Sequence, residues 1–399
     1  TVGEWNLSLR DRILLGPDPW QKIRLTSREK TLLVALSHAK DNTLESGALC
    51  DLFSAEDSDD GMSKHALEEL IARLRNELFQ ADSLTPFVQD TIHANQWLRI
   101  WVPKHYNGLG FSFPEGLTVL RQLAYTDGSL GWLVTLCSGA NYFSRNLVPE
   151  TAYAIFEHEK VCLGGSGTIG GTAEIVANGY LLNGFWPYAS GAPYLTHFTL
   201  NAALTVNGKS VLDEKGETIV KSFVLGSNQV VLVPCWKTMG MVATSSHSFE
   251  VKNQFASEKN VFVYNHFYTE DVLDKIPFDV FADLTLLVNY LGMAEHFLEH
   301  SKANVENPLQ NELADFLTRA ISKVEFFANE VEGKLVEGQD IDDSLRRKCH
   351  DFGIATVDTL IVYFTKLYRL SGIKASRIDE EMNQIFRDFF TATQHRNFR

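Results

Sequence analysis

GTAEIVANGYLLNGFWPYASGAPY, residues 171–194, alternates apolar and polar side chains on both sides of an Asn178-Gly179 pair. Alternation with a period of two is typical of a half-buried strand, and Asn-Gly between two such runs predicts a β-hairpin with a two-residue turn. Because a short turn fixes the strand register, we expect the hairpin over 173–184 to carry WPYASG, residues 186–191, to the rim of a β-domain.

The sequence on either side of this hairpin has a different character. Residues 161–265 continue the alternation, whereas 279–399 show helical periodicity that predicts four long amphipathic helices at 281–303, 309–336, 342–370 and 379–394. Residues 101–160 also read as helical. This order predicts an α+β protein with a helical domain at 101–160, a β-domain at 161–270 and a four-helix bundle at 271–399.

The first hundred residues form a separate region. Short strands are expected at 7–15 and 23–25, a capping box joins Thr26 and Glu29, and a further helix is expected at 45–53. A helix starting at Ser63 carries Leu67, Leu70, Ile71, Leu74 and Leu78 on one face. IRLTSREKTLLVAL, LCDLF and HALEELIARLRNEL resemble the winged-helix effector domain of bacterial response regulators, which implies a domain over 1–100 with its boundary between 79 and 101. TPFVQDTIHANQWLRI, residues 85–100, is either the closing wing hairpin or the first helical segment of the next module.

Composition narrows the functional classes. The net charge of −14 argues against general binding to nucleic acid or anionic membranes. The five cysteines are odd in number and widely spaced, as in a cytoplasmic protein with reduced thiols. No run of residues is long and apolar enough for a membrane helix, and no secretion signal is expected.

Four segments, in the same order along the chain, carry a family resemblance. They are VPKHYNGLGFSFPEGLTVLRQLAYTDGSLGWLVTL (102–136), residues 171–194, WKTMGMVATSSHSFEVKNQFASEKNVF (236–262) and LYRLSGIKASRIDEEMNQIFRDFFTATQH (367–395). Together they resemble the acyl-CoA dehydrogenase superfamily. The ending from Arg387 to His395 is similar to that of the two-component flavin monooxygenases within it. The resemblance implies a β-barrel or sandwich between the helical domains. It also implies FMN or FAD, supplied in reduced form by a partner reductase, and a dimer or tetramer.

The resemblance also implies a flavin site and places residues in it. His395, Ser245 and His247 are the candidate catalytic groups, because hydroxyls and imidazoles hydrogen-bond or exchange protons near neutral pH. The candidate flavin-binding residues are Trp186, Tyr188, Ala189, Ser190, Gly191, Thr244, Ser246 and Arg387. For Trp186 a packed core aromatic, and for His247 a strand residue, are the competing interpretations.

Two departures from the family patterns bear on the choice of function: the first weakens the monooxygenase interpretation and the second weakens the dehydrogenase interpretation. Cys137 stands where many such monooxygenases have histidine or another polar group, and the Tyr-Glu-Gly-Thr segment typical of the dehydrogenases is absent. The first choice is therefore a reduced-flavin-dependent monooxygenase acting on a small organic substrate with O2. An acyl-CoA dehydrogenase-like oxidoreductase is the second. A winged-helix transcriptional regulator with a flavoprotein-like sensor is the third, although the net charge of −5 over residues 1–100 disfavours DNA binding.

Three motifs are expected to carry no chemistry. GSGTIG at 165–170 matches a dinucleotide-binding fingerprint, but a strand follows it where that fingerprint needs a helix. HFLEH at 296–300 matches a zinc-helix pattern, yet a solvated helical face is the simpler interpretation. The acidic run at 57–60 lacks the spacing of a calcium loop. No metal is therefore expected.

Overall fold

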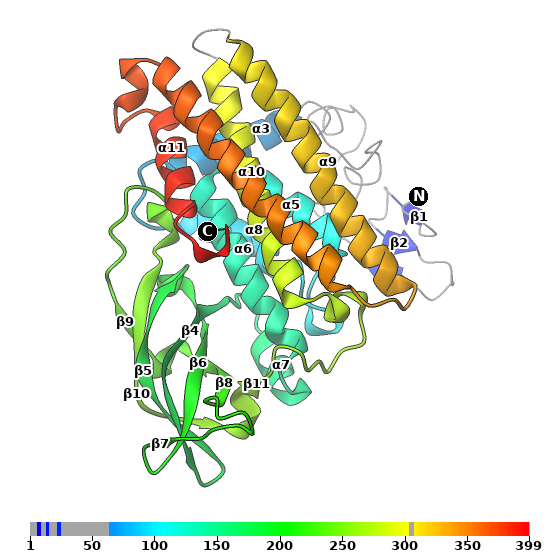
Figure 1. Ribbon diagram of the computed structural model, residues 1–399, viewed down its shortest axis with the longest axis vertical. Helices are drawn as coiled ribbons and strands as arrows, with labels where there is room; N and C mark the ends of the chain where they lie inside the picture. The colour runs from blue at the N-terminus through cyan, green and yellow to red at the C-terminus, as the bar shows by residue number, and fades with distance from the viewer. Residues whose placement is uncertain (1–5, 9–12, 16–21, 25–63, 303–306, 399) are drawn as a thin grey trace. The chain divides into compact units, whose positions relative to one another are not determined.

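The computed structural model describes residues 6–8, 13–15, 22–24, 64–302 and 307–398 (Figure 1). The chain divides into two compact units, Thr1–Glu77 and Leu78–Arg399. The division falls just before the interval in which the sequence placed it.

The first unit contains a small antiparallel sheet in the order β1-β2-β3, formed by β1 (Asn6–Ser8), β2 (Ile13–Leu15) and β3 (Lys22–Arg24). The helix expected after Ser63 is α3 (Lys64–Leu78) and is confirmed. The capping box, the helix at 45–53 and the acidic run at 57–60 lie outside the described residues. The winged-helix resemblance therefore stays a prediction.

Residues 85–100 are helical, which excludes the wing-hairpin alternative. Thr85 caps α4 (Pro86–Ala94), its side chain accepting a hydrogen bond from the Val88 N–H. Pro86 takes the first helical position, where its missing N–H is not needed. The segment belongs to the second unit, whose first helix it forms.

Three further helices precede the sheet: α5 (Phe113–Thr126), α6 (Gly128–Asn141) and α7 (Pro149–Phe156). Ser112 and Glu115 form a capping box at α5, and the Asp127 carboxylate accepts the Leu130 N–H at the start of α6. At the end of α6, Asn141 Oδ1 accepts the N–H of Leu163, the first residue of the sheet, at 2.8 Å. This amide fixes α6 against the sheet.

The β-layer is one eight-stranded mixed sheet in the order β11-β8-β6-β4-β5-β10-β9, with β7 paired to β6 (Figure 1). The pairing of β4 with β6 is parallel and the other pairings are antiparallel. The expected barrel or sandwich is therefore wrong, because the strand path has two separate edges at β11 and β9. The strands are β4 (Leu163–Val176), β5 (Gly179–Ala189), β6 (His197–Val206), β7 (Lys209–Ser210), β8 (Val220–Gly226), β9 (Val231–Val233), β10 (His247–Ser257) and β11 (Val261–Phe262).

The predicted hairpin is present, with its turn one residue earlier than expected. Val176 pairs with Gly179, so Ala177 and Asn178 are the central turn residues, and Asn178 has a φ of 63°. Asparagine tolerates this left-handed conformation. Gly179 is needed for a different reason, because a Cβ there would lie 2.3 Å from the carbonyl oxygen of Ala256 on β10. The strand β4 also runs through GSGTIG, which excludes a dinucleotide fingerprint.

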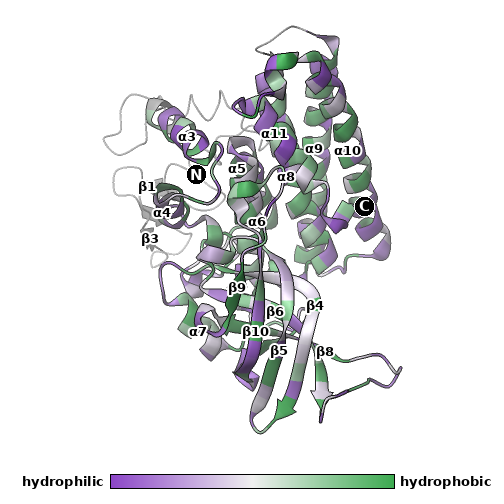
Figure 2. Ribbon diagram, turned by 90° about the vertical axis from the view of Figure 1, so that its left-hand side faces the viewer, coloured by the Kyte–Doolittle hydropathy of each residue, from purple (hydrophilic) through white to green (hydrophobic). Residues whose placement is uncertain are grey.

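The four C-terminal helices match their predictions to within three residues at each end. They are α8 (Phe278–Lys302), α9 (Pro308–Val336), α10 (Asp343–Leu370) and α11 (Glu381–Ala392). Phe364 of α10 stacks between Phe297 of α8 and Phe389 of α11, at centroid distances of 4.0 and 3.8 Å. Within the second unit, these four helices lie beyond one end of the sheet. Figure 2 shows their alternating polar and apolar faces.

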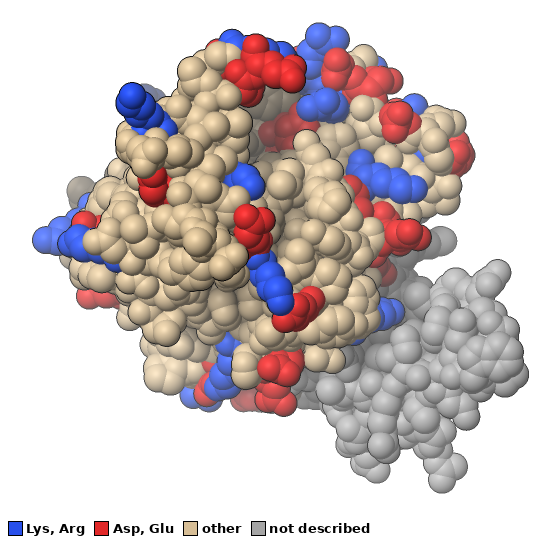
Figure 3. Space-filling view, turned by 90° about the horizontal axis from the view of Figure 1, so that it is seen from below, with Lys and Arg blue, Asp and Glu red and all other residues tan. Residues whose placement is uncertain are grey.

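The described surface and interior fit a globular protein. No helix among the described residues is long and apolar enough to span a membrane. Cys137, Cys162, Cys235 and Cys349 are free thiols. The face seen in Figure 3 mixes both signs of charge with uncharged surface, so that face presents no extended basic track.

Candidate flavin-binding site

Two of the segments expected to form the site meet at the end of the sheet. Ala189, the last residue of β5, pairs with His247, the first residue of β10. The Gly191 N–H donates to the Thr244 carbonyl oxygen at 2.7 Å. Residues 186–191 and 244–247, 53 or more positions apart in the chain, are therefore neighbours.

Left-handed backbone conformations concentrate at this junction. Gly191 has a φ of 74°, and the non-glycine residues Tyr188, Met241 and Ser245 have φ values of 63°, 56° and 44°. Non-glycine residues in this region cost free energy and persist where the surroundings hold them, often at functional sites. The junction thus has a backbone that local sequence preference alone does not give.

A chain of buried hydroxyl groups holds the two segments together. Ser190 Oγ lies 2.9 Å from Ser246 Oγ, which lies 2.8 Å from Thr244 Oγ1. Thr244 Oγ1 in turn donates to the carbonyl oxygen of Met241 at 2.7 Å. All three side chains belong to residues that are at most 5% exposed. In this conformation the three buried hydroxyls bond one another, and they hold the backbone of the two segments in place.

The remaining serine of the group, Ser245, also points inward. Its Oγ donates to the carbonyl oxygen of Asp82 at 3.2 Å, and the residue is 1% exposed. The segment before α4 therefore covers it.

Cys137 of α6 closes the junction from the helical side. Its thiol donates to the Ser190 carbonyl oxygen at 3.6 Å, and a Cβ on Gly191 would lie 3.3 Å from its sulfur. The neighbouring Cys162 thiol and burial together raise the pKa of the Cys137 thiol well above its usual range. Since the thiolate is the reactive form, this shift and the complete burial of the side chain favour a packing role for Cys137.

His247 has a structural task at one of its ring nitrogens. Nδ1 accepts the backbone N–H groups of Cys235 and Trp236, at 3.3 and 3.1 Å. This pattern requires the proton of the neutral ring to be on Nε2. The ring thus anchors the segment between β9 and β10, and only Nε2 is left for exchange with a ligand.

Arg387 and Asp388 of α11 hold that same segment from the other side. The Arg387 guanidinium donates to the Met239 carbonyl oxygen, and Asp388 Oδ1 accepts the Met241 N–H at 2.5 Å. Gly240 lies so close that a Cβ would be 2.2 Å from the Arg387 backbone. The loop 239–241 is therefore clamped on α11, and Arg387 is engaged in this clamp.

Asp388 is a buried acid that the sequence analysis did not single out. Burial and, after it, the nearby carboxylate of Asp127 raise the pKa of Asp388 to about 8. The side-chain amide of Gln384 lies 3.3 Å from Asp127 Oδ2. Only the long-range fold brings these carboxyl groups together, so no local sequence signal could have revealed the pair.

His395 follows α11 and lies against α6. Its ring packs on Trp132 at a centroid distance of 5.5 Å and an angle of 75°. The next residue of α6, Leu133, lies 3.5 Å from the position of a Cβ on Gly191. Helix α6 therefore contacts both the C-terminal segment and the β5 end.

The two aromatic residues of WPYASG have opposite environments. Trp186 is 0% exposed, stacks on Phe249 at 5.5 Å and donates its Nε1–H to the Asn201 carbonyl oxygen. A ring with no exposed surface has no face to offer a cofactor, so the competing interpretation of a core aromatic describes it. Tyr188 is 65% exposed and lies edge-on to Trp236 at 6.1 Å.

Sequence reasoning missed the exposed glycine-rich part of β4. Gly167, Thr168 and Ile169 are exposed, and the register of β4 against β6 shifts on both sides of Ile169. Arg396 lies 3.8 Å from the position of a Cβ on Gly167. The sequence signal for this stretch is the glycine content of residues 164–171, which also produces the match to the dinucleotide fingerprint.

Comparison with known proteins identifies the fold and a set of related oxygenases. No protein-family model matches the chain. Indole-3-acetate monooxygenase of Pseudomonas putida is 24% identical over 300 residues, covering 74% of each protein. HsaA of Rhodococcus jostii, the oxygenase subunit of a flavin-dependent monooxygenase, is 20% identical over 360 residues, covering 82% of this chain and 92% of that protein. The chain is a homologue of the oxygenase components of two-component flavin-dependent monooxygenases.

Solved structures agree with this relationship at the level of the fold, which is that of the acyl-CoA dehydrogenases. XiaF from Streptomyces sp., solved with FADH2 and glycerol, has a TM-score of 0.73, with 18% identity over 83% of this chain and 91% of that chain. TdsC from Paenibacillus sp., solved with FMN and indole, has a TM-score of 0.67, with 20% identity over 83% and 93%. The resemblance inferred from four segments of sequence is thus confirmed.

Proposed function

We propose that this chain is a reduced-flavin-dependent monooxygenase that oxidises a small organic substrate with O2. The observation that carries the proposal is the homology to oxygenase components over most of both chains. Solved proteins of the same fold hold FADH2 or FMN. Reduced FMN or FAD from a separate flavin reductase is the proposed cofactor.

The chemistry of the junction fits a flavin. A planar ring system needs exposed apolar surface and backbone that can approach it closely. Tyr188 and the glycine-rich stretch of β4 offer both, since Ile169 is 60% exposed and Gly167 has no side chain. We assign the exposed Tyr188 to the ring, and the buried Ala189, Gly191, Ser190, Thr244 and Ser246 to holding the backbone that positions it.

The bound flavin would supply the activation of oxygen, and the chain would supply binding, orientation and proton handling. His395 is the proposed acid or base, because it is half-buried and follows the helix that clamps the loop 239–241. His247 and Ser245 are proposed to act through the backbone that they hold. Arg387 is proposed to bind the flavin's ribityl or phosphate group after leaving Met239.

The proposed assembly is a homodimer or homotetramer. The outer helices leave large apolar side chains in water: Val362 and Leu370 are 48% and 49% exposed, and Ile373 and Ile378 are 88% and 73% exposed. Such residues around the end of α10 favour a protein interface. A monomer by light scattering at micromolar concentration contradicts this. For the first unit, we propose a winged-helix domain with a docking or structural role and no DNA binding.

Anaerobic titration of the purified protein with photoreduced FMN and FAD tests the function. Binding of reduced flavin, followed by slower return of oxidised-flavin absorbance on mixing with O2 than in buffer, is expected because the site shelters the ring. Reoxidation at the buffer rate at every protein concentration contradicts the proposal.

The same titration addresses the dehydrogenase alternative, which predicts bleaching of oxidised flavin by an acyl-CoA. We expect none, because the Tyr-Glu-Gly-Thr segment typical of the dehydrogenases is absent from the sequence and with it the carboxylate base that removes the substrate's α-proton.

A further inference from the structure

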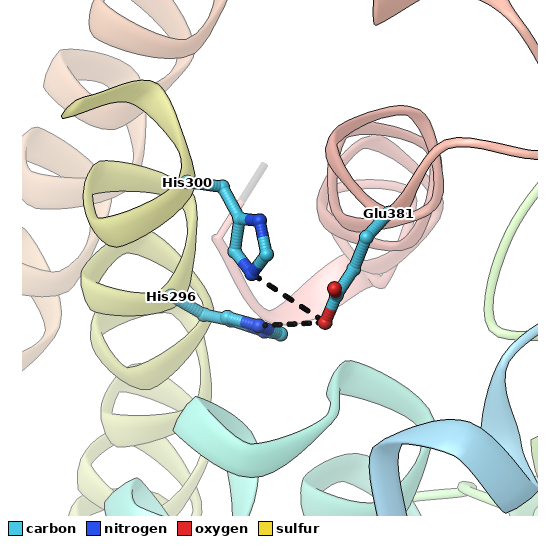
Figure 4. A group of neighbouring side chains, drawn as sticks. All are labelled: His296, His300 and Glu381. Atoms are coloured by element: carbon cyan, nitrogen blue, oxygen red, sulfur yellow. Dashed lines mark ion pairs between the residues drawn. The ribbon is translucent and has the colours of Figure 1, made fainter. Parts of the chain in front are cut away.

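Two histidines of α8 and a glutamate of α11 converge in the C-terminal bundle (Figure 4). His296 and His300 are four residues apart, so they lie on one face of α8. Their Nε2 atoms lie 3.3 and 3.4 Å from the same oxygen, Oε1 of Glu381. The interpretation of HFLEH as a solvated helical face is wrong at His296, which is only 3% exposed.

We propose that His296, His300 and Glu381 form a binding site for a divalent transition-metal ion of the zinc type. Imidazole nitrogens and a carboxylate oxygen are the donors that such ions prefer, and two histidines with one glutamate is a known zinc ligand set. All three ligand atoms lie within 4.8 Å of one another.

The distances match a coordination polyhedron. Metal–ligand bonds of about 2.0–2.1 Å at tetrahedral angles place neighbouring ligand atoms about 3.3 Å apart. The two N···O distances, 3.3 and 3.4 Å, have this length. Direct N–H···O hydrogen bonds are shorter, at about 2.7–3.2 Å. Two of the three ligand–ligand distances therefore have the length expected around one ion, and the third, between the ligand nitrogens of the two histidines, is at most 4.8 Å.

Burial is graded across the site. The side chain of His296 is 4% exposed, whereas those of His300 and Glu381 are 27% and 38% exposed. The protected side excludes competing water, and the open side gives an ion a route and leaves a fourth position for water.

The ion would join two helices with different tasks. Helix α8 lies in the bundle core, and α11 begins at Glu381 and carries the clamp on the loop 239–241, through Arg387 and Asp388. A metal at the first turn of α11 would therefore tie that helix to the bundle and hold the clamp in place.

The test uses the untagged, flavin-free full chain after chelator treatment, titrated with Zn²⁺ in equilibrium dialysis. We expect the parent to bind one Zn²⁺ per chain. In His300→Ala and in Glu381→Gln the affinity for Zn²⁺ should be at least tenfold weaker. His158→Ala is the matched control, because His158 is 73% exposed and lies 4.0 Å from a single glutamate, Glu157. The control should bind as the parent does.

Thermal unfolding separates loss of the site from loss of the fold. Zn²⁺ should raise the melting temperature of the parent and of His158→Ala, and leave that of Glu381→Gln unchanged. Glu381→Gln keeps the size of the side chain, and circular dichroism verifies its fold. Binding that is absent in the parent, or equal in the parent and both ligand variants, overturns the proposal. So does an equal rise in melting temperature with and without Glu381.

Discussion

Asp388→Asn should reverse part of the pH dependence of stability. The Asp388 carboxyl is 3% exposed, and its Oδ1 accepts the Met241 N–H. An asparagine keeps this acceptor and is close in size, but carries no titrating proton. The substitution therefore removes one ionisation and leaves the clamp on the loop 239–241.

The sign follows from where the proton is bound more tightly. Burial first, and the neighbouring Asp127 second, raise the pKa of Asp388 from 3.8 to about 8. Between these values the folded state holds a proton that the unfolded state has lost, so stability is greatest below pH 4 and falls as the pH rises toward 8. The slope is at most about 1.4 kcal/mol per pH unit, which gives up to about 2.7 kcal/mol between pH 5 and pH 7.

Urea unfolding at pH 5, 6 and 7, followed by tryptophan fluorescence, measures the effect. The free energy of unfolding of Asp388→Asn minus that of the parent should increase with pH over this range, by at least 1 kcal/mol and at most about 2.7 kcal/mol. Asp351→Asn, at an exposed position of α10, is the control and should give a flat difference. A flat or falling difference for Asp388→Asn would refute the buried, protonated carboxyl.

Three further predictions concern separate parts of the fold and the site. Tyr188→Ala should weaken binding of reduced FMN about tenfold with little effect on stability, whereas Trp186→Ala should cost about 3–5 kcal/mol of stability, measured by flavin titration and urea unfolding; equal loss of stability in both contradicts the assignment. Gly240→Ala should destabilise the fold by about 1–3 kcal/mol because its Cβ meets the α11 backbone, whereas Gly333→Ala, which meets nothing within 4 Å in the α9 interior, should stabilise it by about 0.5–1 kcal/mol. Asp274→Ala should lower the free energy of unfolding by about 3–5 kcal/mol, because the fully buried guanidinium of Arg145 loses its carboxylate partner at 2.8 Å. A loss below about 1 kcal/mol in urea unfolding would contradict this.

The elements that follow from local rules were predictable. The four C-terminal helices repeat apolar residues with the helical period over 12 to 29 positions, so their ends were predicted to within three residues. The hairpin was predictable from another local rule, the alternation of apolar and polar residues on both sides of Asn178-Gly179. Its turn was misplaced by one residue because Gly179 is required by β10, a strand that comes 68 positions later.

The shape of the β-domain was not predictable from alternation. A period of two assigns side chains to faces but does not say whether the first and last strands pair. Here β4 pairs with β5 and, in parallel, with β6, and the path continues outward to separate edges at β11 and β9. The family resemblance suggested closure, and the strand order corrected it.

In the candidate site, too, some features were predictable from the sequence and others depend on the fold. Ser190, Thr244 and Ser246 lie together in the structure, as the family resemblance implied for these distant segments, whereas their role in binding flavin stays a prediction. Their inward orientation was not foreseen, since sequence gives no measure of whether a hydroxyl finds a partner inside the protein. Trp186 and Tyr188 show the same limit, being two positions apart in a strand and therefore expected on one face, yet one is buried and the other is 65% exposed. The left-handed φ of 63° at Tyr188 breaks the strand alternation and turns its ring outward.

Helix α11 gathers most of what the sequence left unassigned, and its contacts explain why. Glu381 reaches α8, Arg387 reaches the Met239 carbonyl, and Asp388 reaches the Met241 N–H. Each partner is at least 80 positions away in the chain, so no pattern within the helix could predict it. Because these contacts fix the start and the middle of the helix, the loop 239–241 cannot shift without moving α11 or breaking two hydrogen bonds. The hydroxyl chain begins at the Met241 carbonyl, so the geometry around Ser190 and Gly191 depends on α11 although the helix contributes no residue to that chain.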